Sequence, residues 1–219
     1  MIEENYERIT VTEVKKIEER GDMAGLLALL DPSASVAVRR AAARGLAVAA
    51  PRKFAPQLAK NLAEETDRGV KLSLLQTLGR LGDDEALPAL LLALKDREPL
   101  VCEEAALALS RYNSEAAYEA LLASLRQNDD DRSWSARRYA AEALGRLSDP
   151  RAVPALIEAL RDDNPLVRPA VALALGRLGD KEAVAALKRV RHTTPHQRGA
   201  ECAECKAIDA ALRQLENKI

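Results

Sequence analysis

The densest group of side chains that could do chemistry lies near the end of the chain, in the segment HTTPHQRGAECAEC. His192 and His196 are four residues apart, and Cys202 and Cys205 form a Cys-x-x-Cys pair. Tetrahedral zinc is commonly bound by His and Cys side chains at short spacings of this kind. The pattern makes these four residues candidate ligands of a small structural zinc site, and zinc is the only cofactor that the sequence suggests.

Two other interpretations of this segment stay open. Four potential ligands can occur by chance in a variable loop, and Pro195 indicates that the histidines flank a loop. A redox-active cysteine pair is the second alternative, although the strand–helix–strand context of thioredoxin-like proteins is absent. Under either alternative the chain binds no cofactor.

Other catalytic signatures are missing from the sequence. The phrase GRLGD ends a helix and follows no strand, so it does not form a nucleotide-binding loop. There is no Gly-x-Ser-x-Gly nucleophile motif. Histidine occurs at only two positions, so most acid–base arrangements lack their usual residue. We therefore predict no catalytic residues and expect that the chain is not an enzyme.

The elements that must position these residues are repeats. The phrases QTLGRLGDDEALPAL, EALGRLSDPRAVPAL and LALGRLGDKEAVAAL begin at residues 76, 142 and 173. A repeated phrase indicates a repeated structural unit. In residues 148–178, apolar side chains recur at three- and four-residue spacing on either side of the break RDDN, which predicts two amphipathic helices. Such a pair cannot bury both apolar faces alone, whereas stacked pairs can.

The ends of these helices carry recognisable signals. Asp149 and Asn164 are good N-cap residues, and each is followed by a proline that fits the first helical position. Gly179 follows the last apolar residue, where a left-handed C-cap favours glycine. Gly176 lies inside the helix, where it costs about 1 kcal/mol relative to alanine. Its presence there predicts a close approach by a neighbouring helix.

The whole chain is predicted to be one all-α solenoid domain over residues 1–219. Residues 1–19 are expected to form a capping helix that starts at Thr10 or Thr12. About six antiparallel helix pairs follow, with the approximate bounds 20–50, 51–81, 82–112, 113–147, 148–178 and 179–215.

Composition limits the class of protein. The net charge is −1 and Ala and Leu supply most of the apolar content, which is typical of a soluble helical protein without a general affinity for nucleic acid or membrane. The N-terminal residues are acidic and polar, so we expect no signal peptide. The apolar runs are too short to span a bilayer. Three cysteines are too few for a disulfide scaffold, and we expect a cytoplasmic protein.

The pattern DP-AV-AL-EAL-DD-P-VR--A--ALGRLGD resembles the HEAT-like repeats of the phycobilisome lyase type. The resemblance covers nearly the whole chain and is strongest in the last four units. It implies a right-handed superhelix whose second helices line the concave side, and it implies a binding scaffold more often than an enzyme. Deoxyhypusine hydroxylase, an enzyme that resembles this fold, uses His-Glu pairs in several repeats. No His-Glu dipeptide occurs here, so we do not expect that activity.

Aligning the second helices brings arginines, acidic residues and aromatic residues into one stripe on the expected concave face. Arginine and aromatic side chains are enriched at the centres of protein interfaces. We predict that this stripe binds a partner protein, which could carry an acidic segment, and that the chain is a monomer. The predicted stripe consists of Arg80, Glu103, Glu104, Leu107, Arg111, Trp134, Arg138, Tyr139, Glu142, Arg146, Leu173 and Arg177.

Several alternatives stay open for the stripe and for the function. Its arginines could instead pack on the next repeat and bond loop residues such as Asp83, Asp149 or Asp180. Trp134 could be a packing anchor for the longer loop before it or an exposed contact residue. Nucleic-acid binding, as in HEAT-like alkylpurine glycosylases, is disfavoured because lysine is sparse on the stripe. A bilin lyase or chromophore-handling role has no residue that marks a tetrapyrrole site.

Overall fold

The computed structural model describes residues 9–112, 114–127, 133–193 and 202–216, and over these ranges the chain forms helices and no strands. This confirms the predicted all-α fold of antiparallel helix pairs. The chain divides into two compact units, residues 1–112 and residues 113–219, which are described separately. The division falls between the third and fourth predicted repeats, and a single array over all 219 residues stays a prediction.

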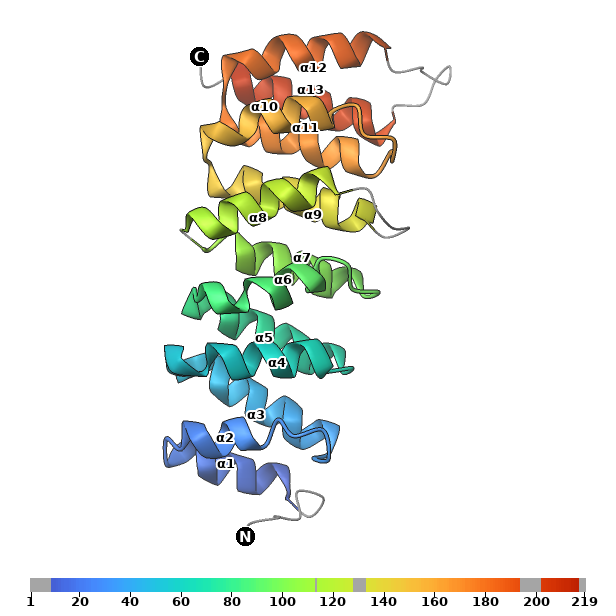
Figure 1. Cartoon of the computed structure of the whole chain (residues 1–219). Helices are drawn as coiled ribbons and strands as arrows, with labels where there is room; N and C mark the ends of the chain where they lie inside the picture. Colours follow the sequence, from blue (N-terminus) through green and yellow to red (C-terminus); the bar gives the residue numbers. More distant parts are fainter. Residues whose placement is uncertain (1–8, 113, 128–132, 194–201, 217–219) are drawn as a thin grey trace. The chain divides into compact units, whose positions relative to one another are not determined.

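The N-terminal unit contains a capping helix and three helix pairs (Figure 1). In each pair we call the earlier helix the first helix and the later one the second helix. The second helices α3, α5 and α7 pack side by side in one layer, and α4 and α6 pack in the other. The bounds are α1 (Val11–Glu19), α2 (Met23–Ala28), α3 (Val36–Ala49), α4 (Ala55–Glu64), α5 (Arg68–Leu81), α6 (Leu87–Ala93) and α7 (Pro99–Leu109).

The C-terminal unit repeats this arrangement with three further pairs (Figure 1). Its second helices α9, α11 and α13 pack side by side, and α10 contacts both α8 and α12 in the layer of first helices. The bounds are α8 (Glu115–Arg126), α9 (Ser133–Leu147), α10 (Val153–Ala159), α11 (Val167–Leu178), α12 (Lys181–Thr193) and α13 (Ala203–Glu216). In the described parts of the chain, no helix is both long and apolar enough to cross a membrane.

Most of the predicted end signals work as expected. Thr10 caps α1 in a capping box with Glu13, which settles the choice between Thr10 and Thr12. Gly179 ends α11 in the left-handed conformation with a φ of 79°. Asp149 accepts a hydrogen bond from the N–H of Arg151 and caps a 3-10 turn, Pro150–Ala152, that leads directly into α10, as predicted. The predicted start of α11 was too early, because Asn164 accepts from the N–H of Leu166 and closes a short turn before α11 begins at Val167.

The internal glycines of the repeated phrase lie where second helices touch. A Cβ added to Gly176 would lie 2.8 Å from the Cα of Ala211 on α13, so the predicted close approach is confirmed. The same contact occurs at Gly79 against Ala108 on α7, and at Gly145 against α11. Only a residue without a Cβ lets the helix backbones approach this closely.

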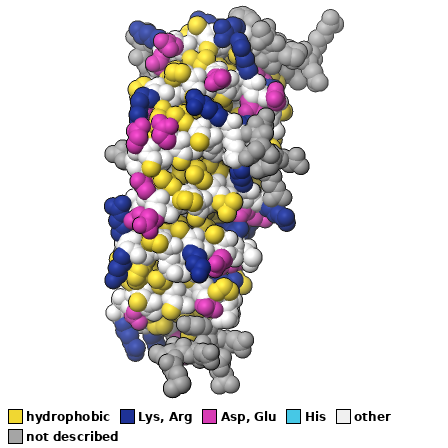
Figure 2. Space-filling model, in the orientation of Figure 1, with side chains coloured by type: hydrophobic (Ala, Val, Ile, Leu, Met, Phe, Trp, Pro, Cys, Tyr) yellow, Lys and Arg dark blue, Asp and Glu magenta, His cyan; other side chains and the backbone are white. Residues whose placement is uncertain are grey.

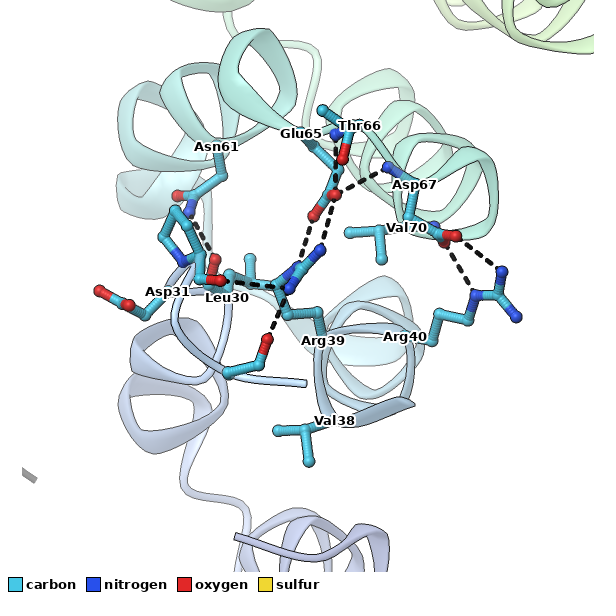
Figure 3. Close-up of polar contacts among 12 residues, drawn as sticks. Leu30, Asp31, Val38, Arg39, Arg40, Asn61, Glu65, Thr66, Asp67 and Val70 are labelled. Carbon is cyan, nitrogen blue, oxygen red and sulfur yellow. Dashed lines mark hydrogen bonds and ion pairs between the residues drawn. The ribbon is translucent and has the colours of Figure 1, made fainter. Parts of the chain in front are cut away.

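A buried ion pair joins the first and second repeats of the N-terminal unit (Figure 3). Arg39 on α3 donates through Nε and Nη2 to the two carboxylate oxygens of Glu65, at 2.9 and 3.1 Å. It also donates to the carbonyl of Ala34 in its own repeat. Burial alone would raise the pKa of Glu65. The hydrogen bonds from Arg39 and from the backbone N–H groups of Asp67 and Thr66 outweigh this effect and leave that pKa below its usual value.

Equivalent ion pairs recur one repeat later and in the C-terminal unit. Each cation lies within the first five residues of a second helix, and each carboxylate lies in the following repeat. Each of these pairs ties two adjacent repeats of one unit together, and its bonds are formed only when both repeats are folded. They are Lys71 with Asp96, Arg137 with Asp162, and Arg168 with Glu204.

Candidate partner-binding surface

The structure places the predicted stripe on the second helices or directly after them. The α5 and α7 members belong to the N-terminal unit, and the α9 and α11 members belong to the C-terminal unit. Arg80, Glu103, Arg111, Arg146 and Arg177 are exposed, whereas Glu104, Leu107, Trp134, Arg138, Glu142 and Leu173 are partly buried.

Tyr139 is the member of the stripe whose predicted exposure is wrong. Its side chain is buried, with 5% of its surface exposed, so it belongs to the core of the C-terminal unit. Its neighbour Arg138 lies over the Tyr139 ring at 5.0 Å and pairs with Glu142 one turn later. The polar atoms at this part of the stripe therefore already bond one another.

Arg80 has a structural role that differs from the one considered from the sequence. Its guanidinium donates to the carbonyls of Leu46, Ala47 and Ala50 at the end of α3, and not to Asp83. Asp83 instead accepts a hydrogen bond from Arg52. The last carbonyls of a helix lack partners within the helix and carry partial negative charge, so a cation is favourable there.

The N-terminal unit has an arginine-lined pocket of ≈ 370 Å³ between the second helices α3 and α5, which the sequence analysis missed. The signal that could have found it is the pair of arginines four residues apart on α3, since that spacing places both on one helix face. We call it the arginine pocket, and it is lined by Arg40, Arg44, Arg68, Gly69, Leu72 and Ser73.

Arg40 and Gly69 shape one wall of the arginine pocket. Arg40 donates two hydrogen bonds to the carboxylate of Asp67, at 2.8 and 2.7 Å (Figure 3). A Cβ added to Gly69 would lie 3.0 Å from Nε of Arg40, so the glycine makes room for the side chain of Arg40. The same Asp67 side chain caps α5. This wall is therefore held in place by the ion pair and by the cap of α5.

Arg44 is the cation in this pocket that is available to a ligand. It is exposed, and its Nε donates to the backbone carbonyl of Arg40 at 3.3 Å. Within the described residues, no carboxylate pairs with it. Arg68 makes only a long contact of 3.7 Å with Glu98. Three arginines with two nearby carboxylates leave the pocket with a net positive charge.

Charges of both signs are mixed on the visible face of each unit and in a second pocket. Figure 2 shows Lys and Arg side chains interspersed with Asp and Glu side chains on the visible face of each unit. In the C-terminal unit, a larger pocket of ≈ 560 Å³ has three residues of each sign in its wall. The charged residues lining it are Arg126, Arg137, Arg161, Glu158, Asp162 and Asp163.

The Arg40–Asp67 pair predicts an acid-sensitive N-terminal unit. Asp67 accepts hydrogen bonds from Arg40 and from the N–H of Val70. These bonds lower the pKa of Asp67 to about 2, against the effect of burial. An unfolded Asp has a pKa of about 3.9, so the unfolded chain binds the proton first as the pH falls. The stabilisation from this carboxylate is complete at neutral pH and is lost as the pH falls from about 4 to about 2.

Urea unfolding followed by circular dichroism at about pH 5 and pH 3 measures this loss. An Asp67→Asn variant keeps a capping side chain but cannot ionise. It should be less stable than the wild type at neutral pH and lose less further stability on acidification. Equal losses in the two proteins would contradict the assigned role of Asp67.

Two of the four predicted zinc ligands lie together at the start of α13. The sulfur atoms of Cys202 and Cys205 are 2.8 Å apart, and the backbone N–H of Cys205 donates to the sulfur of Cys202 at 3.2 Å. The hydrogen bonds with the thiol and backbone N–H of Cys205 lower the pKa of Cys202. The hydrogen bond with Cys202, followed by burial, raises the pKa of Cys205 to about 11.

The zinc site itself stays a prediction. His196 lies outside the described residues, and the side chain of His192 is not among those described, although its backbone belongs to α12. Among the residues that the structure describes, no three His, Cys, Asp or Glu side chains come together as a metal-binding group.

Comparison with known families identifies the repeats. A family model for HEAT repeats matches three overlapping stretches of the chain, residues 23–91, 55–135 and 129–204. These stretches cover most of the chain. They confirm the resemblance that the repeated phrases indicated.

Three solved structures are similar to this chain at low sequence identity. An engineered protein has a TM-score of 0.46 and 22% identity, covering 90% of this chain and 97% of that one. Human deoxyhypusine hydroxylase in complex with glycerol has a TM-score of 0.45 and 22% identity, covering 93% and 77%. The complex of CpcE and CpcF of phycocyanin lyase from Nostoc sp. PCC7120 has a TM-score of 0.43 and 23% identity, covering 92% and 85%.

One curated relative corrects a prediction from the sequence. The chain is 29% identical over 155 residues to deoxyhypusine hydroxylase-B of Oryza sativa subsp. japonica, which covers 70% of this chain and 49% of the relative. The chain thus spans about half the length of the relative. Because that relative is an enzyme, the similarity contradicts the prediction that this chain is not one. The prediction relied on local motifs, which do not detect residues that a solenoid gathers from separate repeats.

Proposed function

Because this chain belongs to the HEAT-repeat family, we propose that it binds an acidic segment of a partner protein across the second helices of its N-terminal unit. Stacked repeats present an extended, rigid surface, which suits the binding of another chain. The observation that carries this proposal is the arginine pocket with its exposed Arg44, which pairs with no carboxylate in the described part of the chain.

The arrangement of the pocket favours a carboxylate ligand. A guanidinium group can donate two parallel hydrogen bonds to a carboxylate, and these bonds are stronger than those between neutral groups. Arg40 already forms such a pair with Asp67, and this holds it beside Arg44. A Glu or Asp side chain of the partner would complete the corresponding pair on Arg44.

Apolar side chains around the arginines indicate that the partner segment also carries apolar residues. Val48 lies one helical turn beyond Arg44 on α3 and is 75% exposed. Leu72 on α5 and Leu107 on α7 are partly exposed on the neighbouring second helices. An amphipathic acidic segment would cover these side chains while its carboxylates face Arg44 and Arg68.

Carboxylates near the same surface argue for a protein partner over a nucleic acid. Glu103 is exposed on α7, and Asp67 and Glu98 lie beside the pocket. These groups repel a continuous row of phosphates, whereas a protein segment can place its charges selectively. We assign recognition, and not chemistry, to this surface, so it could serve a scaffold or an enzyme that holds a protein substrate. We also propose that the chain acts as a monomer in the cytoplasm.

The test is an Arg44→Glu variant in a capture experiment. Immobilised wild-type and variant proteins are exposed to an extract of the native host, and the captured proteins are identified and then purified for titration. An exposed ion pair contributes about 1 kcal/mol or less, but the Arg44→Glu change also adds repulsion between two carboxylates, so we expect binding of the partner to weaken by about tenfold. Because the contact is exposed, added salt should also weaken binding to the wild type.

Lys60→Glu is the matched control. Lys60 is exposed on the first helix α4 of the same unit, and its substitution makes the same change in charge. The true partner is the protein that Lys60→Glu retains and Arg44→Glu loses, with helicity unchanged in both. Equal retention of every captured protein by the two variants would refute the assignment of Arg44.

A further inference from the structure

We propose that Cys202 and Cys205 form a reversible thiol–disulfide site at the start of α13, oxidised by glutathione disulfide or a similar small disulfide. The two sulfur atoms are 2.8 Å apart, so each is within reach of the other. The site belongs to the C-terminal unit and does not depend on the proposed function. The two side chains therefore already lie together, and only a small shift of the sulfur atoms is needed to bond them.

The start of the helix accounts for this proximity. Residues three apart on a helix lie on the same face, and the carbonyl of Cys202 already accepts the hydrogen bond from the N–H of Lys206. The N–H of Cys205 donates to the sulfur of Cys202, which orients that side chain toward its neighbour. A disulfide has a sulfur–sulfur distance of about 2.05 Å, so the atoms must approach by less than about 1 Å.

Two ion pairs hold the first turns of α13 against their neighbours. Glu204, between the two cysteines, accepts a bond from Arg168 on α11 at 3.0 Å. Asp209, about one turn later, pairs with Arg191 on α12 at 2.7 Å. This packing keeps both thiols in place in the reduced protein, so closing the disulfide loses little conformational freedom.

The two cysteines have different exposures and therefore different roles. Cys202 is partly exposed, whereas Cys205 has 3% of its surface exposed. An incoming disulfide can reach Cys202 first, and Cys205 then attacks from the protein side.

The exchange proceeds in two balanced steps. The Cys202 thiolate attacks one sulfur of glutathione disulfide, and the glutathione sulfur–sulfur bond breaks. One glutathione leaves as a thiolate and takes up a proton from water. The Cys205 thiol gives its proton to water and attacks the sulfur of Cys202, which releases the second glutathione. Two protein thiols become one disulfide, and one glutathione disulfide becomes two glutathione molecules.

The test incubates the full chain in glutathione buffers of increasing oxidised fraction and then alkylates it in denaturant for mass spectrometry. We expect two of the three cysteines to escape alkylation together and the protein, before alkylation, to weigh two hydrogens less. Excess reduced glutathione should make both cysteines available for alkylation again. A Cys205→Ser variant should stop at the first step and carry one glutathione on Cys202. Peptide mapping should place the disulfide between residues 202 and 205.

Cys102→Ser is the matched control. Cys102 is the cysteine outside the proposed site, and it is buried, with 2% of its surface exposed. This variant should oxidise as the wild type does. The proposal is refuted if both thiols still alkylate fully in the most oxidising buffer, or if native mass spectrometry finds zinc that keeps them reduced until a chelator is added.

Discussion

Replacing Arg137 by methionine is expected to lower the free energy of unfolding of the C-terminal unit by about 3–5 kcal/mol. Arg137 donates to both carboxylate oxygens of Asp162, at 2.6 and 3.0 Å, and both side chains are only 8% exposed. It also donates to the carbonyl of Gln127 at 3.0 Å. Removing the guanidinium leaves a buried carboxylate without its counter-charge, which is the costly half of a buried ion pair.

The only tryptophan of the chain makes this loss measurable. Trp134 is partly buried in α9, one turn before Arg137, so its fluorescence reports on the C-terminal unit. Urea unfolding of the full chain, followed at this tryptophan, gives the change in stability. A loss below about 1 kcal/mol, the size expected for an exposed ion pair, would show that the pair is not buried as described.

A double variant distinguishes the effect of the missing Arg137 charge from the effect of lost side-chain packing. In Arg137→Met with Asp162→Asn, the buried charge is removed, while the asparagine oxygen can still accept from the N–H of Asn164. Replacing both members of a buried pair is much less costly than removing one. The double variant should therefore be more stable than Arg137→Met alone. If it is equally unstable or less stable, the loss comes from packing and not from the unpaired carboxylate.

Replacing Gly79 by valine is expected to destabilise the N-terminal unit by about 1–3 kcal/mol. A Cβ at this position would lie 2.8 Å from the Cα of Ala108 and 2.9 Å from its Cβ. Because the nearest atom belongs to the backbone, no side-chain rotation relieves the contact, and α5 and α7 must move apart. Helix propensity alone predicts the opposite sign, since valine is the better helix former by about 0.3 kcal/mol.

Gln76→Val is the control for this prediction. Gln76 is exposed on the same helix, about one turn before Gly79. It introduces the same side chain without a helix contact and should change stability by less than about 0.5 kcal/mol. Thermal unfolding followed by circular dichroism compares the two variants. A Gly79→Val protein as stable as the wild type would show that the two helices have room to separate.

The helix pairs could be predicted because their signals are local. Apolar spacing, N-cap residues and glycine C-caps act within one helix or its adjoining turn, and these signals placed all six pairs and the capping helix. Gly176 predicted a close helix contact because glycine inside a helix lowers helix stability, and a close approach by a neighbouring helix explains why it is there. The prediction that failed at a helix start concerned Asn164, because an Asn side chain can close a turn as well as cap a helix.

The candidate site was less predictable because the side-chain partners come from other repeats. Arg39 binds a carboxylate 26 residues later, and Arg137 binds one 25 residues later. Nothing local marks such pairs. The arginine pocket likewise forms between α3 and α5, from residues in two repeats. Its arginines lie in the first two repeats, where the repeated phrase is weakest.

By itself, the sequence determined the helical repeat, its length and the positions at which helices approach closely. Only the tertiary structure decided which side chains of each second helix face solvent. The stripe predicted from the sequence included Arg138 and Tyr139, but Arg137 carries the buried ion pair and Tyr139 lies in the core. Successive residues on a helix are about 100° apart. A shift of one residue therefore separates a surface contact from a buried bond, and only the packing of neighbouring helices fixes that rotation.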